Sequence, residues 1–429
     1  MFFFVACLVC CYDILSYLFF FFFFFFFILF RFFLYFFWNQ VHHRTALPAA
    51  GWFNAQIQEP GVLHQRCSRY IGSTRSYLEM ESEDELQGVA LGDLRNSFCN
   101  FVATLCTHLN GEAFEYFFPD EVRTDLFSLF SKWCAVFGGP SPDGAISQSS
   151  DTRLTFAALQ AIASLCRGPL FDFQIAIANE GYLCRWLVKV MACDNPDAQS
   201  YGRRALESLL MYNQNESQFV SWAIRQVYEA DSPSVRENAF LAMANVLREF
   251  ETFPISRVQS MCLALFMSAD LALPIKQQAK LLLLTLKERF FGDTDEELLL
   301  PLSLPQTVMS MHSQDQLVLS RDLAKKHPEH TLNVFLELSH RFQSASKDAR
   351  RMCLSCLTPW LEGIHLIRQP SPEGFGQLGC HPYHVLNNLL FMCLQTDVGD
   401  ESLKLWASLC QTPENVVIIL EYLIELVGS

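Results

Sequence analysis

The residues best suited to chemistry in this chain are cysteines and histidines that could coordinate a metal ion. Cys380, His381 and His384 lie close together in a segment rich in proline and glycine, and Cys353 and Cys356 precede them. Thiolate and imidazole groups at short spacing are the ligands that zinc prefers. Cys353 and Cys356, however, fall on an apolar helical pattern without turn residues between them, which favours a core role. We therefore assign no metal ligand.

No other group of residues forms a catalytic pattern. The chain lacks the phosphate-binding G-x-x-x-x-G-K-[ST], a G-x-G-x-x-G that follows a strand, the G-x-S-x-G nucleophile elbow and the H-E-x-x-H zinc motif. His327, His330 and His340 gather near Pro328, where they suit a polar helix end. The carboxylates are numerous but dispersed. We predict no catalytic, cofactor-binding or metal-binding residue, and a protein that is not an enzyme.

The net charge makes some kinds of partner unfavourable, and the cysteine content indicates the cellular compartment. The formal net charge is −14, and an acidic chain is a poor match for the phosphates of nucleic acids. The basic clusters Arg203-Arg204, Lys325-Lys326 and Arg350-Arg351 are short, and we interpret them as solvated helix faces. Most of the 16 cysteines fall inside apolar helical patterns, which indicates reduced thiols in a cytosolic protein.

Residues 1–38 differ from the rest of the chain because they are almost wholly apolar and contain an unbroken phenylalanine run, Phe19–Phe27. The segment Ile14–Trp38 is long enough to be a membrane span, and it lacks the features of a signal peptide. A third interpretation is a gene-model artefact, since a translated poly-T tract would produce such a run. Residues 39–85 form an irregular linker without helical periodicity.

Residues 86–429 show a repeating pattern of turns and helices. Spacings of 43, 37, 39 and 45 residues separate five aspartate-containing turns, and paired helices repeating at roughly 40 residues are typical of HEAT and armadillo solenoids. The fold class is therefore predicted as all-α: antiparallel helix pairs stacked in a right-handed superhelix, without a β-sheet. The turns are Asp151-Thr-Arg153, Asp194-Asn-Pro196, Asp231-Ser-Pro233, Asp270–Pro274 and Asp315-Gln-Leu317.

The Asp231 turn shows the pattern most clearly. Asp231 is expected to cap the next helix, and Pro233 suits its first turn because it has no N–H to satisfy. Val235, Ala239, Ala242 and Val246 then fall on one face of that helix, where small side chains allow close packing. We expect Glu237 to lie on the opposite, exposed face. The helix predicted for 413–427 stays apolar almost to the last residue and has no polar cap, which suggests a fragment of a longer array.

One segment resembles the Furry family of cell-morphogenesis proteins. The family pattern hPELTxxhFxExxxRFQxA is matched by Pro328-Glu329, Thr331, Phe335, Glu337 and Arg341-Phe342-Gln343, and the later LLPWhxN turn by Pro359-Trp360-Leu361. His330 and Gly363 depart from the pattern. Leu405-Trp406 and the segment 413–420 also resemble the family, so the resemblance covers about residues 86–429, the family's central region.

This resemblance implies a non-enzymatic, HEAT/armadillo-like scaffold of the cytoplasm, cell cortex or cytoskeleton. It implies a role in cell morphogenesis, polarised growth and neuron projection development. The partners that it implies are NDR-class kinases, their Mob co-activators and microtubule-linked proteins, and no contact residue can be carried over. The alternative is a membrane-anchored helical-repeat adaptor that uses Ile14–Trp38.

Overall fold

The helical periodicity of the sequence is realised as sixteen α-helices in the described part of the chain. The computed structural model describes residues 85–109, 111–134, 152–171, 182–291, 312–366, 379–380, 382–395 and 398–428, which all belong to one unit, Leu78–Ser429. The predicted segment 1–38 and residues 39–84 lie outside them. The domain boundaries therefore stay predictions, whereas the all-α fold class is confirmed.

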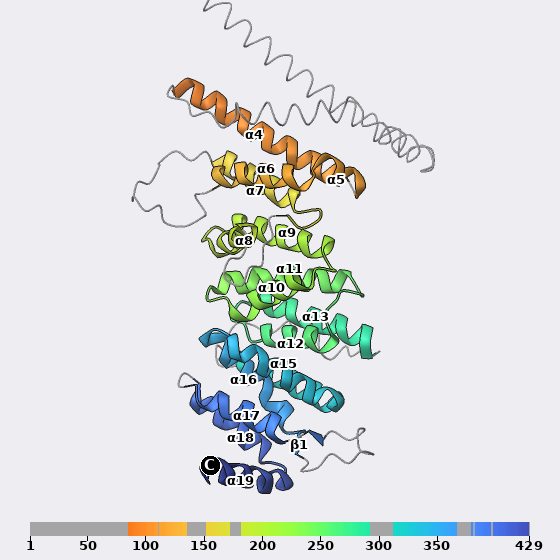
Figure 1. Ribbon diagram of the computed structural model, residues 1–429, viewed down its shortest axis with the longest axis vertical. Coiled ribbons are helices and arrows are strands. Elements are labelled where there is room, and N and C mark those ends of the chain that lie inside the picture. The colour runs from red at the N-terminus through yellow and green to blue at the C-terminus, as the bar shows by residue number, and fades with distance from the viewer. Residues whose placement is uncertain are drawn as a thin grey trace, which may run out of the picture. The chain divides into compact units, whose positions relative to one another are not determined.

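The helices follow one another with few other elements between them (Figure 1). They are α4 (Glu85–His108), α5 (Glu112–Phe117), α6 (Asp120–Trp133), α7 (Thr152–Leu165), α8 (Tyr182–Ala192), α9 (Pro196–Tyr212), α10 (Ser217–Glu229), α11 (Pro233–Glu249), α12 (Arg257–Met267), α13 (Leu273–Phe291), α14 (His312–Lys326), the 3₁₀ turn η3 (Pro328–His330), α15 (Thr331–Ser344), α16 (Lys347–Leu361), α17 (Pro382–Cys393), α18 (Gly399–Leu409) and α19 (Pro413–Gly428).

The starts of the helices are fixed by side chains close to each turn. The Asn195 side chain accepts hydrogen bonds from the backbone N–H groups of Asp197 and Ala198 and so caps α9. Pro233 opens α11 as predicted, but the N-cap residue is Ser232 and no side chain caps this helix, so the capping role predicted for Asp231 is wrong. Asp315 is not in a turn either, because it lies inside α14.

The aspartate turns join the two helices that pack against each other. Across the Asp194, Asp231 and Asp270 turns, α8 packs on α9, α10 on α11, and α12 on α13. Helix α9 packs on α8 far more extensively than on α10, although a connection of similar length joins α9 to α10.

Every second helix stacks in the same layer. Alternate helices α7, α9, α11 and α13 contact one another in order, as do α14, α16 and α18 (Figure 1). Asn238 Nδ2 donates to Gln199 Oε1 and Asn245 Nδ2 to Glu207 Oε2, residues 39 and 38 apart. These bonds place α9 and α11 parallel at the spacing that the repeat predicted. The handedness of the superhelix stays a prediction.

The predicted inner face of α11 is confirmed. Val235, Ala239, Ala242 and Val246 are buried, with exposures of 0–1%. In the neighbouring α9, Gly202 allows a close approach to α8, because a Cβ there would lie 3.1 Å from side-chain atoms of both Val190 and Met191. The core of these repeats is therefore set by small residues that let helix backbones come near one another.

Two short strands interrupt the run of helices. A parallel ladder joins β1 (His365–Leu366) to β2 (Gly379–Cys380), so the prediction of no β-sheet is wrong for these four residues.

In the described part of the chain, none of the helices combines the length and apolarity needed to cross a bilayer. The segment Ile14–Trp38 lies outside that part.

Candidate functional site

The segment that carries the family resemblance lies mainly in the interior. Phe335 and Phe342 of α15 and Trp360 of α16 are fully buried, and Arg341 is 9% exposed. The outward side of α15 instead carries Asn333, Leu336, His340 and Gln343. Of the matched letters, most therefore specify how this repeat packs. Pro328, Glu329 and Gln343 are exposed and are the exceptions.

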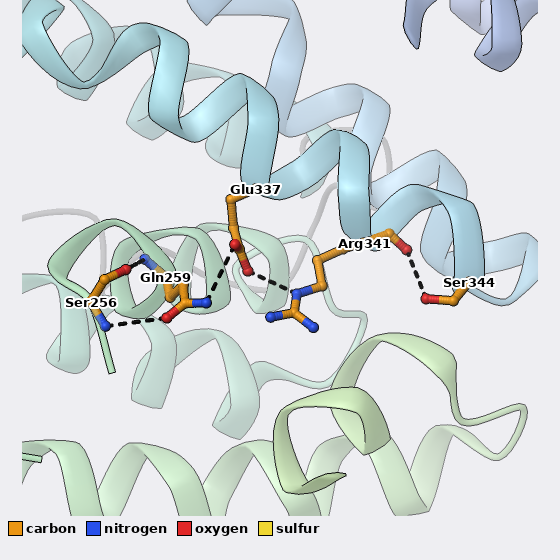
Figure 2. A network of polar contacts seen from close by, with 5 residues as sticks. All are labelled: Ser256, Gln259, Glu337, Arg341 and Ser344. Carbon is orange, nitrogen blue, oxygen red and sulfur yellow. Dashed lines mark hydrogen bonds and ion pairs between the residues drawn. The ribbon is translucent and has the colours of Figure 1, made fainter. Parts of the chain in front are cut away.

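A polar network joins α12 to α15 (Figure 2). Glu337 Oε1 accepts a 2.8 Å hydrogen bond from Arg341 Nε, and Gln259 Nε2 donates to Glu337 Oε2 at 3.4 Å. Gln259 is itself held by the capping box at the start of α12, in which Ser256 N–H donates to Gln259 Oε1 and Gln259 N–H to Ser256 Oγ. A helix cap thus orients the side chain that reaches the next repeat.

The same network reaches a third helix. The Arg341 guanidinium lies 5.6 Å from the centre of the Tyr228 ring of α10, a cation–π contact. Tyr228 is buried and its ring lies 4.5 Å from that of Phe266 in α12. The backbone carbonyl of Tyr228 accepts from Ser346 N–H, just before α16. Helices α10, α12 and α15 therefore meet around one buried arginine.

A second buried network joins α14 to α16. Ser320 Oγ donates to the Cys356 carbonyl at 2.7 Å, and Trp360 Nε1 donates to Ser320 Oγ at 2.9 Å. Gln316 Nε2 lies 3.0 Å from the Leu265 carbonyl and 2.7 Å from Cys356 Sγ. Gln316, Ser320 and Trp360 are all 0% exposed, so these bonds form in a low-dielectric interior, where losing one is costly.

Buried amides close two further turns in the same way. Asn213 Oδ1 accepts from Leu170 N–H, and its Nδ2 donates to the Gly168 carbonyl. Asn415 Oδ1 accepts from Leu366 N–H, and its Nδ2 donates to the Ile364 carbonyl. These asparagines, Gln316 and Ser320 were not predicted from the sequence. The available signal was a polar residue at an inward position of an apolar helical pattern.

Two of the candidate metal-binding thiols lie in the core. Cys353 and Cys356 are buried on α16, and burial raises the pKa of the Cys353 thiol to about 12. A thiol held neutral in this way is a poor nucleophile and a poor metal ligand. The side chains of Cys380 and His381 lie outside the described residues. In the part of the chain that the structure describes, no three His, Cys, Asp or Glu side chains gather in a metal-binding arrangement.

The basic clusters have different surroundings. Arg204 and Lys325 are exposed, and Lys326 forms an ion pair with Asp322 at 3.5 Å, as expected for solvated faces. Arg350 differs, because its guanidinium lies 5.6 Å from the Phe342 ring centre and donates to Gln395 Oε1. That arginine connects α16 to the end of α17, so the prediction of a purely solvated face is wrong there.

A G-x-G-x-x-G pattern does follow a strand, contrary to the expectation from the sequence, and all of it except Gly379 lies outside the described residues. The sequence G-F-G-Q-L-G runs from Gly374 to Gly379, after β1 rather than directly at the start of a helix. Gly379 belongs to β2, and α17 begins at Pro382. A dinucleotide-binding loop instead opens straight into a helix whose N-terminus faces the pyrophosphate. Residues 367–378 lie outside the described part.

The arrangement of these groups supports a structural role for the buried polar residues. They join segments from 36 to 78 residues apart in the chain and leave the outward helix faces exposed. A comparison with known protein families agrees with the resemblance noted from the sequence. A family model described as the cell morphogenesis central region matches residues 198–427, which is just over half of the chain and covers α10 to α18 entirely.

Proposed function

The chain belongs to the cell morphogenesis central region family, and from this premise we propose that it is a non-enzymatic scaffold that binds proteins through its helical-repeat surface. A role in cell morphogenesis follows from the family itself. The scaffold role is supported by the stacking of helix pairs, since arrays of this kind present extended surfaces that partners span over several repeats.

The observation that carries the proposal is where the family-defining side chains lie. Glu337 contacts Gln259 of α12, Arg341 contacts Tyr228 of α10, and Trp360 contacts Ser320 of α14. Phe335 is fully buried. Side chains in such positions preserve the geometry of the surface without supplying a reacting group. We infer that a protein whose family-matching side chains build the frame in this way acts through the faces that the frame holds in place.

The partners that we propose come from the Furry-family resemblance. They are an NDR-class kinase, its Mob co-activator or microtubule-linked proteins. We propose that the chain binds them in the cytoplasm, at the cell cortex or on the cytoskeleton during polarised growth, including the growth of neuron projections. The formal net charge of −14 favours partners with basic stretches. The membrane-anchored alternative depends on Ile14–Trp38, outside the described residues, and no structural observation favours it.

The test is affinity capture from cytosol with the full chain, at low and at high ionic strength. We expect a kinase, a Mob co-activator or a cytoskeletal component to be enriched, and the basic partners to be weakened at high salt, because screening shortens the range of surface charge. The matched control is Ala239→Asp, which disrupts the α11 core and should lose every specific partner.

Two results would contradict the proposal. Enrichment of none of these three partner classes at either ionic strength would remove the proposed partners. The second result is an enzymatic activity that copurifies with the chain to homogeneity and that Ala239→Asp abolishes. Such an activity would replace the scaffold role with an enzymatic one.

A further inference from the structure

The outward sides of α8 and α10 carry positive charge in an acidic chain. The formal net charge of the chain is −14, yet α8 holds Arg185 and Lys189 and no Asp or Glu. Helix α10 holds Arg225, and its single carboxylate, Glu229, is its last residue. Arg185, Lys189 and Arg225 are all exposed. The exposed carboxylates of the connecting turns lie beyond the helix ends: Asp194, Glu216 and Asp231.

The packing of the repeats brings these cations to one surface. Trp186 of α8 and Trp222 of α10 are 6% and 1% exposed, so each helix buries one side and turns the other outward. Because α8 packs on α9, α10 packs on α11, and α9 stacks on α11, the two helices occupy equivalent places in consecutive repeats. Arg225 follows Lys189 by 36 residues, close to the repeat length. Arg185 lies one helical turn before Lys189.

The charged groups of this surface are available to a partner. Among the described residues, Arg185, Lys189 and Arg225 form no ion pair and no hydrogen bond through their charged groups. Tyr182 lies beside them, 46% exposed, with its ring centre 6.0 Å from the Arg185 guanidinium. Tyrosine and arginine are among the residue types that contribute most to binding at protein interfaces.

We propose that the outward side of α8 and α10 is a docking surface for an acidic helical segment of a protein partner. Carboxylates four residues apart on such a helix have the spacing of Arg185 and Lys189, and arginine pairs with carboxylates through two parallel hydrogen bonds. The inference deepens the proposed scaffold role and rests on it, since it names the chemistry of one partner site. Its sign is opposite to that of the acidic surface that favours basic partners.

Larger polyanions match this surface less well. A nucleic acid or an anionic bilayer carries charge over a long distance, so it would also meet the carboxylates of the turns and the rest of a chain with a net charge of −14. A short acidic segment meets the local surface alone, because salt at about 0.1 M screens charges more than about 10 Å away.

The direct test uses the full chain and two labelled designed helical peptides. One peptide carries glutamates at steps of four residues, and the other carries glutamines at the same positions. Fluorescence anisotropy at low salt should show that the glutamate peptide binds at least about tenfold more tightly than the glutamine peptide. The difference should shrink at high salt, because the surface is exposed.

Charge reversal locates the binding. Arg185→Glu with Lys189→Glu should weaken the glutamate peptide about tenfold or more, because attractive pairs become repulsive. A peptide with lysines in place of the glutamates should bind this variant better than the parent. Adding Arg225→Glu should weaken the glutamate peptide about threefold further, which shows that the site spans two helices.

A control variant separates the local surface from the net charge. Lys325→Glu with Lys404→Glu makes the same change in net charge at exposed residues of α14 and α18, and it should weaken the glutamate peptide less than about threefold. Thermal melts by circular dichroism should show that every variant remains folded.

Three results would overturn the selectivity of the site. One is equal binding of the glutamate and glutamine peptides to the parent. Another is an equal loss of binding in the α8 variant and in the α14 and α18 control. The third is binding of phosphatidylserine–phosphatidylcholine vesicles, or of a single-stranded oligonucleotide, that Arg185→Glu with Lys189→Glu abolishes, which would make a larger polyanion the ligand.

Two further results would assign the surface to a different occupant. Asp172 and Glu180 are the carboxylates that precede α8 most closely in the sequence. If Asp172→Asn with Glu180→Gln binds the glutamate peptide at least about tenfold more tightly than the parent, the chain itself supplies the occupant. A dimer in sedimentation velocity that the α8 variant converts to monomer would make a second copy the occupant. Loss of peptide selectivity while kinase, Mob or cytoskeletal capture persists would refute this site and leave the scaffold role standing.

Discussion

The joint between α9 and α11 and the joint between α14 and α16 connect neighbouring repeats by different means. In the first, α11 contributes the fully buried alanines Ala239 and Ala242, and one hydrogen bond joins Asn238 to Gln199. In the second, the centre itself contains hydrogen bonds, from Trp360 to Ser320 and from Ser320 to the Cys356 carbonyl.

The two joints differ in what fixes the register in which neighbouring helices stack. In a joint of small side chains, shape fixes the register. Bulky or charged side chains are excluded, whereas side chains of similar volume are tolerated. A joint with buried hydrogen bonds is specified by direction, because each donor must find its acceptor. The family-like letters Trp360, Glu337 and Arg341 belong to the second kind, whereas the alanines of α11 belong to the first.

The largest effect is expected from charge in the shape-specified joint. Ala239→Asp places a carboxylate at a position with 0% exposure, where an unpaired charge costs several kcal/mol. We expect a lower melting temperature or loss of the cooperative transition by circular dichroism. Ala230→Asp, at the partly exposed end of α10, is the matched change. Equal melting of Ala239→Asp and the parent would show that this face is not a joint.

A smaller effect is expected from removing one donor in the direction-specified joint. Trp360→Phe keeps an aromatic ring but loses the indole N–H bonded to Ser320 and part of the volume. We expect a loss of about 1–3 kcal/mol in the free energy of unfolding, measured by urea denaturation. Trp133→Phe, at a partly exposed position, should cost clearly less. If the two substitutions cost the same, the buried bond adds nothing to packing.

The α12–α15 network should show a loss that salt hardly changes. Glu337→Gln removes the charge that Arg341 Nε contacts at 2.8 Å, where the two side chains are 15% and 11% exposed. We expect about 1–2 kcal/mol of destabilisation, similar at low and high ionic strength, because a mostly buried pair is poorly screened. The exposed pair of Arg351 and Glu401 provides the contrast, and Glu401→Gln should be nearly neutral. A Glu337→Gln effect that disappears in high salt would place the pair at the surface.

The smallest effect concerns Glu237, which the structure places differently from the sequence prediction. It is partly buried, and its pKa is raised by that burial and by the nearby Asp270 carboxylate, with Arg236 opposing. The face of α11 on which Glu237 lies is therefore only partly exposed at this position. Between the ordinary pKa of 4.5 and the raised one, the folded chain holds more protons than the unfolded chain, so this carboxyl makes stability fall as pH rises.

Glu237→Gln should remove that pH-dependent part and be neutral or slightly stabilising at pH 7. The measurement is the melting temperature of parent and variant between pH 4 and pH 7, with Glu249→Gln, exposed near the end of α11, as control. A parent whose stability relative to the variant increases with pH over this range would contradict the assignment, because a carboxylate stabilised in the folded state has the opposite slope.

The repeat, the helices and the inner face of α11 were predictable because they depend on local signals. Periodic apolar residues and turns about 40 residues apart are visible along the chain, and the hydrogen bonds between stacked helices join residues at that spacing. The apolar character of the helix at 413–427 was visible too. The family assignment came from letters whose positions in the fold were not predictable.

The sequence by itself determined the class of fold and the residues that face inward, since both follow from the period of hydrophobicity. Only the tertiary structure decided which helices pair across each turn, that Ser232 rather than Asp231 precedes α11, and that Gln316, Ser320 and Asn415 are buried hydrogen-bond partners. The physical reason is that a polar side chain is inward only where another element, distant in sequence, supplies its partner. No local pattern contains that distant group.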